Sequence, residues 1–258
     1  MYLTVYGSYG ECCDVEFESE RLALLDRGFV WAAAAVRGGG ECGIPWRDAG
    51  RKLQRATAVN DFLSVSRYLQ DTGWCAAGRL VTSGASAGGF VVAAAMNVAP
   101  SLTRAVVASV PFVDCLTTLL DPTLPLTVCD WEEFGNPLED AEAYRLLRAV
   151  SPMDNIPPAG VALPHVLLQT AWQDTRVGFW ESFAFAARLR EREDAVATGR
   201  ILLHHCEFGA GHGGASGRYE RLKEIAREYA FAVLVQRAAP HDVPTVAAEN
   251  AKAADGSL

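Results

Sequence analysis

The chain has 258 residues, a net charge of −8, and a composition that is 50% hydrophobic and 21% charged. This balance is typical of one large globular domain, and without an apolar run of about 18 residues the sequence predicts no membrane-spanning helix. Without a stretch rich in Lys and Arg it also predicts no nucleic-acid partner, and the acidic charge favours cationic partners only weakly.

Short apolar segments alternate with segments of helical periodicity along the chain. Strands are expected at residues 3–6, 29–36, 79–83, 105–110, 166–170 and 201–205. Helices are expected at residues 18–27, 56–72, from Phe90 onward, and at 139–150, 178–192 and 219–236, with the rest of 115–150 irregular. This alternation implies βαβ units, and it therefore predicts an α/β fold with a mostly parallel sheet and helices on both faces.

The composition also bounds the domain and its setting. Residues 1–237 are expected to form the domain, and residues 238–258, which are rich in Ala without periodicity, a disordered tail. The start lacks a basic region, so no secretory signal is predicted. Seven cysteines without a C-x-x-C pair are typical of reduced thiols in a cytoplasmic protein. No cofactor is indicated, and no metal site, because no histidines cluster with the cysteines.

The stretch GASAGG at residues 84–89 places one serine among small residues, between an expected strand and an expected helix. A G-x-S-x-G sequence in that context is typical of a nucleophile elbow, which raises the serine hydroxyl above the sheet. Gly84 and Gly88 are then needed because a Cβ would collide with the neighbouring strand or helix. We therefore predict that Ser86 is a nucleophile and that the N–H of Ala87 meets a developing oxyanion. Ordinary small-residue turns match the same motif.

A serine nucleophile needs a base, and this fold orders its residues Ser, Asp, His, each after a strand. Asp174 and His212 both follow expected strands, and His212 lies in a glycine-rich loop. The other histidines lie in a strand, before a strand or in the tail. In the predicted mechanism Ser86 attacks a carbonyl, His212 takes and later returns the proton, and Asp174 orients the ring. The alternative is that His212 is an ordinary histidine of a surface loop, without a catalytic role.

Several ordered stretches between residues 3 and 235 match one known family. They are Tyr6-Gly-Ser-Tyr-Gly, Val36-Arg-Gly-Gly-Gly-Glu41, Ser86-Ala-Gly-Gly89, Val110-Pro-Phe-Val-Asp114, Leu119-Leu-Asp-Pro122, Trp131-Glu-Glu-Phe-Gly-Asn-Pro137 and the glycine-rich run from Gly209 to Tyr219. On these residues the chain resembles the catalytic domain of the prolyl oligopeptidase family, and within it the oligopeptidase B members. The resemblance implies an α/β-hydrolase domain capped by a β-propeller, and a serine peptidase that cleaves short peptides after Arg or Lys.

The resemblance also implies roles for residues outside the elbow. The predicted nucleophile, acid and base all fall on the family's triad. Tyr6 falls on the tyrosine whose hydroxyl is the second oxyanion donor, beside the Ala87 N–H; a phenol is a good neutral donor to an alkoxide. Arg176 falls on an arginine that binds a backbone carbonyl of the substrate. The alternatives are that Tyr6 only packs at the end of a strand and that Arg176 is an ordinary surface arginine.

Four acidic residues fall on positions that the family uses for basic substrate side chains. Asp130 and Glu132 match the pair for the P1 residue, which precedes the scissile bond, and Asp14 and Glu16 match positions linked to P2. Paired carboxylates hold a guanidinium with bidentate geometry. Asp130 is one methylene shorter than the Glu usual in the family, which is expected to loosen the pocket or favour Arg over Lys. The alternative for all four is a solvated negative face.

The chain also departs from the family pattern. Ala85 stands where members carry Gly and Thr175 where others often have Pro, and neither change removes a catalytic atom. The larger departure is that no propeller and no strands before Tyr2 are seen, so we expect a fragment or a truncated gene product with exposed apolar surface. Two other functions stay open: an esterase or lipase of the same fold, with an apolar acyl pocket, and a remnant that no longer catalyses.

Overall fold

A computed structural model describes residues 1–13, 16–191 and 199–237 of the chain. The disordered tail expected at 238–258 lies outside the described residues. All seven cysteines are free thiols. Within the described part of the chain, no helix is long and apolar enough to cross a membrane.

A six-stranded sheet forms the centre of the structure, in the order β2-β1-β3-β4-β5-β6. Every neighbouring pair of strands runs parallel. The strands are β1 (Tyr2–Val5), β2 (Trp31–Ala34), β3 (Val81–Ala85), β4 (Ala105–Ser109), β5 (His165–Ala171) and β6 (Leu202–Glu207). Because the strands are parallel, their carboxyl ends meet at one edge of the sheet, and the loops that follow them lie together there.

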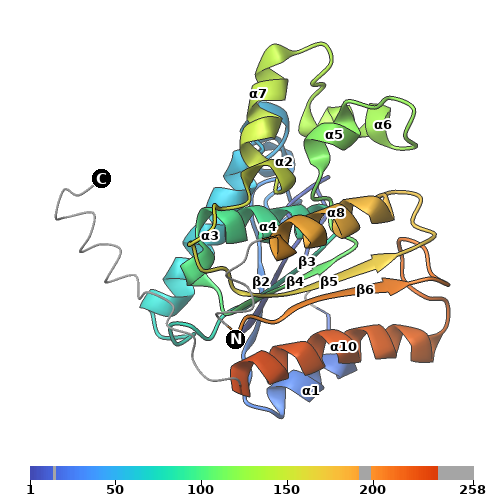
Figure 1. The fold of residues 1–258 in the computed structure, drawn as a ribbon. Helices are drawn as coiled ribbons and strands as arrows, with labels where there is room; N and C mark the ends of the chain where they lie inside the picture. Colours follow the sequence, from blue (N-terminus) through green and yellow to red (C-terminus); the bar gives the residue numbers. More distant parts are fainter. Residues whose placement is uncertain (14–15, 192–198, 238–258) are drawn as a thin grey trace.

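Helices cover both faces of the sheet, as Figure 1 shows. On one face lie α3 (Ala56–Asp71), α4 (Ala87–Val98) and α8 (Phe179–Arg190), and on the other α1 (Leu22–Leu25) and α10 (Arg218–Arg237). Further from the sheet on the first side lie α2 (Ile44–Asp48), α5 (Cys115–Leu119), α6 (Thr127–Phe134) and α7 (Ala141–Val150). Short 3-10 turns lie at Ser19–Arg21, Lys52–Gln54, Pro100–Leu102 and Met153–Asn155. The expected α/β sheet with helices on both faces is confirmed.

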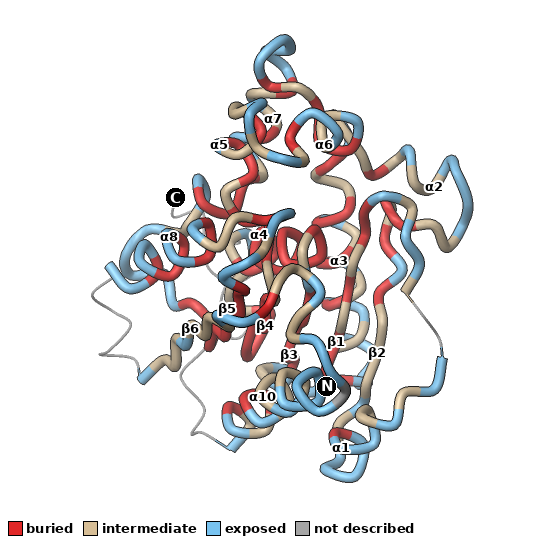
Figure 2. The backbone as a smooth tube through the Cα atoms, turned by 90° about the vertical axis from the view of Figure 1, so that its right-hand side faces the viewer, coloured by how far each residue is buried: buried red, intermediate tan, exposed pale blue. Residues whose placement is uncertain are grey.

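Buried residues concentrate on the strands and on the helix faces packed against them (Figure 2). Successive side chains of a strand point to opposite faces of the sheet. In β4, Val106 and Ala108 therefore join the larger core beneath α3, α4 and α8, whereas Ala105 and Val107 join the smaller core beneath α10. Helix α4 is buried from Ala87 to Met96, as its run of small and apolar residues predicts.

Two expected elements differ in the structure. Residues 115–150 hold α5 and α6 in addition to the expected helix near α7. These two helices have five and eight residues, too short to show a clear helical period in the sequence. The helix expected over 18–27 is only a 3-10 turn followed by the four-residue α1, in which Leu24 alone is buried. With so little apolar surface to bury, a longer helix gains little there.

Candidate active site

Ser86 stands between the end of β3 and the start of α4. Its φ of 55° and ψ of −119° give it a positive φ, which residues other than glycine rarely adopt. Three backbone hydrogen bonds hold it: its N–H donates to the carbonyl oxygen of Ser109 at 2.9 Å, and its carbonyl accepts from the N–H groups of Phe112 at 3.1 Å and Phe90 at 3.2 Å. Strain of this kind persists only where the surroundings impose it, and it is typical of a nucleophile elbow.

Three glycines around the serine leave no room for a side chain. A Cβ on Gly84 would lie 2.2 Å from the carbonyl oxygen of Gly88, and a Cβ on Gly88 would lie 2.3 Å from that of Val5 in the neighbouring strand. A Cβ on Gly89 would lie 2.5 Å from the Cβ of Pro111. The steric need predicted for Gly84 and Gly88 is confirmed.

Asp174 and His212 meet beyond the carboxyl ends of β5 and β6. The Nδ1 atom of His212 lies 2.7 Å from Oδ2 of Asp174. The other carboxylate oxygen accepts from the backbone N–H groups of Arg176 and Val177, at 2.8 and 2.9 Å. The Asp174 side chain is fully buried, whereas that of His212 is 15% exposed. This is how a carboxylate orients an imidazole whose other nitrogen stays available for a proton.

A cavity of about 400 Å³ opens beside the elbow. Its lining residues are Tyr6, Tyr9, Glu11, Ser86, Ala87, Phe112, Leu126, Asp130, Arg176, Val177 and His212. The predicted nucleophile, base and oxyanion donors therefore share one cavity, although they come from distant parts of the sequence. A larger cavity, of about 590 Å³, shares Tyr6 and His212 with the first but is not lined by Ser86.

Tyr6 and Ala87 are placed to supply two hydrogen-bond donors to this cavity. Burial raises the pKa of the Tyr6 phenol, the charge of Glu11 adds to that rise, and a hydrogen bond with Ser86 opposes it. A phenol with a raised pKa stays protonated at neutral pH and can donate. Ala87 is the first residue of α4, so its N–H has no partner within the helix. Two such donors suit an oxyanion.

Asp130, on α6, brings an acid into the same cavity. The Tyr9 hydroxyl donates to its Oδ1 at 2.9 Å. Burial raises the pKa of Asp130, the hydrogen bond from Tyr9 lowers it, and the charge of Glu133 raises it again. Asp130 is thus a half-buried carboxyl for which a cationic group would be the favourable partner.

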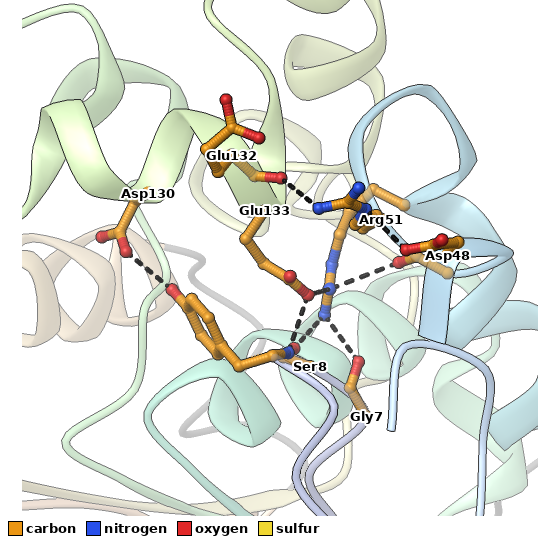
Figure 3. A network of polar contacts seen from close by, with 10 residues as sticks. Gly7, Ser8, Asp48, Arg51, Asp130, Glu132 and Glu133 are labelled. Atoms are coloured by element: carbon orange, nitrogen blue, oxygen red, sulfur yellow. Dashed lines mark hydrogen bonds and ion pairs between the residues drawn. The ribbon is translucent and has the colours of Figure 1, made fainter. Parts of the chain in front are cut away.

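Glu132 lies two residues further along α6 and does not line this cavity. Its side chain is 76% exposed, and its Oε2 lies 2.8 Å from Nζ of Lys52. Figure 3 shows its carboxylate pointing away from Asp130. The structure thus does not bring together the two acids that the sequence analysis paired for P1.

Of the remaining residues predicted to bind substrate, one lines the cavity, one does not, and one lies outside the described residues. Arg176 is exposed and lines the cavity. Glu16 is exposed and does not line it. Asp14 lies outside the described residues.

A buried ion pair, not found by sequence reasoning, holds the turn after β1 (Figure 3). Arg55 is fully buried, and its Nη1 lies 3.1 Å from Oε1 of Glu133. The guanidinium also donates to the carbonyl oxygen of Gly7 at 3.1 Å and to the Ser8 hydroxyl, while Glu133 accepts from the Tyr9 N–H at 2.8 Å. Because the pair spans 78 residues of sequence, no local pattern marks it.

Comparisons with known proteins indicate one family. A family model described as the prolyl oligopeptidase family matches residues 15–237. Protease 2 of Moraxella lacunata is 40% identical over 227 residues, which are 88% of this chain and 32% of that protein. Dipeptidyl aminopeptidase BI of Pseudoxanthomonas mexicana is 39% identical over 227 residues, 88% of this chain and 30% of that protein.

Solved structures give the same picture. Oligopeptidase B from Trypanosoma brucei with covalently bound antipain superposes with a TM-score of 0.86 and 37% identity, covering 93% of this chain and 33% of that one. Oligopeptidase B from Leishmania major superposes with a TM-score of 0.85 and 35% identity, covering 91% and 32%. The chain spans about a third of the length of the curated relatives it matches.

Proposed function

The chain belongs to the prolyl oligopeptidase family, and we propose that it is the catalytic domain of a serine peptidase that cleaves short peptides after Arg or Lys. The observation that carries the proposal is the arrangement of residues around one cavity. Ser86 occupies the strained turn, His212 is bonded to the buried Asp174, and a single cavity lies beside the serine and the histidine. The relatives named Protease 2 and Dipeptidyl aminopeptidase BI support peptide cleavage as the reaction.

The proposed reaction uses only groups that line or support this cavity. The Ser86 Oγ attacks the scissile carbonyl carbon while His212 accepts the hydroxyl proton, and Asp174 stabilises the imidazolium. The Tyr6 hydroxyl and the Ala87 N–H donate to the carbonyl oxygen as it becomes negative. The imidazolium then gives its proton to the leaving amine as the C–N bond breaks. Water attacks the resulting acyl-enzyme, with the imidazole again as base, and releases the acid and the free serine.

The preference for a basic P1 residue is assigned to Asp130. It lines the same cavity as Ser86, and its half-buried carboxyl lacks a cationic partner among the described residues. We assign Glu132 a contact with substrate only after its exposed pair with Lys52 opens, and such pairs are weak. Arg176, at the same cavity, is assigned to a backbone carbonyl of the substrate.

Labelling by a fluorophosphonate tests whether the site is assembled. The purified chain is treated with the reagent, and Ser86→Ala is the control. We expect labelling of the chain and none of the variant, because the reagent reacts with a serine hydroxyl that a neighbouring base activates. A folded chain, shown by a cooperative thermal transition, that takes up no label would contradict the proposal and favour the non-catalytic remnant.

Substrate comparison tests the peptidase against the esterase or lipase of the same fold. Asp130→Asn should lower kcat/KM for an Arg amide about tenfold or more, because a hydrogen-bonded charge pair is lost. The loss for a neutral ester should be much smaller. Equal losses on both substrates would remove Asp130 from the P1 site, and a chain that hydrolyses only the neutral ester would be an esterase.

A further inference from the structure

His212 lies in the short loop that connects β6 to α10 (Figure 1). The loop is anchored before the histidine, where the N–H of Gln173 donates to the carbonyl oxygen of Ala210 at 3.0 Å. It then turns tightly, because the N–H of Gly214 donates to the carbonyl oxygen of Gly211 at 3.0 Å. The loop contains five glycines, which restrain the backbone little. The position of the imidazole therefore depends on contacts from outside the loop.

Glu224, on the second turn of α10, supplies such a contact after the histidine. Its Oε1 accepts from the N–H of Ala215 at 3.0 Å. Its Oε2 lies so close to Gly214 that a Cβ built on this glycine would overlap the carboxylate. One carboxylate therefore contacts two consecutive residues at the end of the turn that carries His212, and this turn is held on both sides.

Helix α10 is itself fixed to the sheet close to Glu224. Glu228 lies one turn further along the helix, on the same face. Its Oε1 accepts from the Ser109 hydroxyl and from the side-chain amide of Gln169, both at 2.7 Å, and so joins α10 to β4 and β5. The carbonyl oxygen of Ser109 is the one that accepts from the N–H of Ser86. The helix that holds the histidine loop is therefore bonded to the same residue that holds the elbow.

We propose that Glu224 is a positioning residue for the reaction: by accepting from the N–H of Ala215, it holds the loop so that the His212 ring keeps its place beside Ser86. This inference rests on the proposed function. Glu224 does not line the cavity beside the serine, so its role is separate from substrate binding. Without it, the loop keeps the bond to Asp174 but can pivot about that bond. Because a displaced base accepts the proton less often, the loss falls on kcat rather than on KM.

The test measures kcat and KM on a fluorogenic amide of acetyl-Ala-Arg, together with the rate of labelling by a fluorophosphonate. Glu224→Ala should lower kcat and the labelling rate by the same factor, about three- to tenfold, with little change in KM, because one hydrogen bond to the loop is lost. Glu224→Gln keeps an oxygen that can accept from the Ala215 N–H, so it should restore most of both rates. This rescue separates the hydrogen bond from the negative charge.

Glu220→Ala is the matched control, because Glu220 is exposed one turn earlier on α10 and pairs with Lys223. It should keep the kcat and the labelling rate of the parent chain. Parent rates in Glu224→Ala, or a Glu224→Gln variant as slow as Glu224→Ala, would overturn the inference while the peptidase function stands. So would a loss that active-site titration attributes to fewer active molecules rather than slower ones, because Glu224 would then only stabilise the fold.

The parent chain separates this inference from the function on which it rests. A parent chain that neither hydrolyses the amide nor takes up the label would overturn the proposed function, and the role of Glu224 with it.

Discussion

Asp130 shows how a single residue is tuned by its position on α6. Burial and the charge of Glu133 raise its pKa, and the hydrogen bond from Tyr9 opposes them. Burial disfavours the charged carboxylate, so an incoming guanidinium gains by restoring a counter-charge. In the proposed role, Asp130 would combine recognition of a cationic side chain with an ionisation that its burial controls.

A pH dependence follows for substrate preference. As the pH falls through the raised pKa of Asp130, the carboxylate is protonated and its attraction for a cation is lost. As the pH is lowered, we expect the ratio of kcat/KM for an Arg substrate to that for a neutral substrate to decline. The decline should begin at a pH higher than about 3.9, where an ordinary aspartate titrates. Effects of pH on the shared reaction steps act on both substrates and cancel in the ratio. In Asp130→Asn the ratio should be flat, and a parent chain that is equally flat would contradict the assignment.

Gly88→Ala tests the packing that creates the elbow. Alanine is normally the better helix residue by about 1 kcal/mol, so a gain in stability would be expected from propensity alone. The contact with the carbonyl oxygen of Val5 should instead make the variant less stable by about 1–3 kcal/mol, measured by urea unfolding. Gly209→Ala is the control, because nothing lies within 4 Å of a Cβ there. A more stable Gly88→Ala would show that β1 and α4 can separate at no cost.

At the scale of elements, the turn after β1 is held by side chains from α6 and from the start of α3. The Arg55 guanidinium sits over the rings of Phe90 and Phe134, at 5.2 and 4.7 Å from their centroids. Its pairing with Glu133 joins the turn to α6. One buried pair therefore sets the spacing between the two elements that carry Tyr6 and Asp130.

Arg55→Met should lower the free energy of unfolding by about 3–5 kcal/mol, because it leaves the Glu133 carboxylate buried without its counter-charge. Lys52→Met breaks the exposed pair with Glu132 and should change the free energy of unfolding by no more than about 1 kcal/mol. Denaturant titration of both variants measures the contrast. Similar losses in the two would mean that the buried pair does not hold the turn.

Helix α6 also shows why the paired acids were only partly predictable from the sequence. Residues three apart in a helix share a face, whereas residues two apart do not. Asp130 and Glu133 therefore both turn toward the turn after β1, and Glu132 turns to solvent. The pairing of Asp130 with Glu132 rests on the family resemblance, and because residues 115–150 are expected to be largely irregular, the sequence alone does not show which way each acid faces on a helix. The elbow at Ser86 was predictable because its glycines and its place between a strand and a helix are local features.

At the scale of the whole molecule, parallel strand order explains why distant residues meet. Ser86 follows β3, Asp174 follows β5 and His212 follows β6, so all three lie at one edge of the sheet. That convergence follows from alternating strands and helices in the sequence. The ion pairs beneath it do not, because a partner 78 residues away leaves no trace in a local pattern.

Glu181 links α8 to the loop after β4, and it makes stability depend on pH. It is buried and accepts from the N–H groups of Val113 and Asp114, at 3.0 and 2.8 Å, and from the Thr118 hydroxyl at 2.7 Å. Burial raises its pKa to about 7, against these hydrogen bonds and with help from the charge of Asp114. The folded chain therefore holds this proton at a pH where the unfolded chain, with a glutamate pKa of about 4.3, has released it.

The sign of the pH effect follows from that difference. The stabilising contribution is present below about pH 4.3 and is lost as the pH rises through about 7, a change of about 4 kcal/mol over the whole window. Glu181→Gln cannot ionise, so its Tm should rise relative to the parent chain between pH 5 and pH 7 and level off by pH 8. Glu139→Gln, an exposed control, should follow the parent chain throughout. A Tm difference between Glu181→Gln and the parent that stays constant from pH 5 to pH 8 would mean that Glu181 is already ionised in the folded protein, held by its three donors.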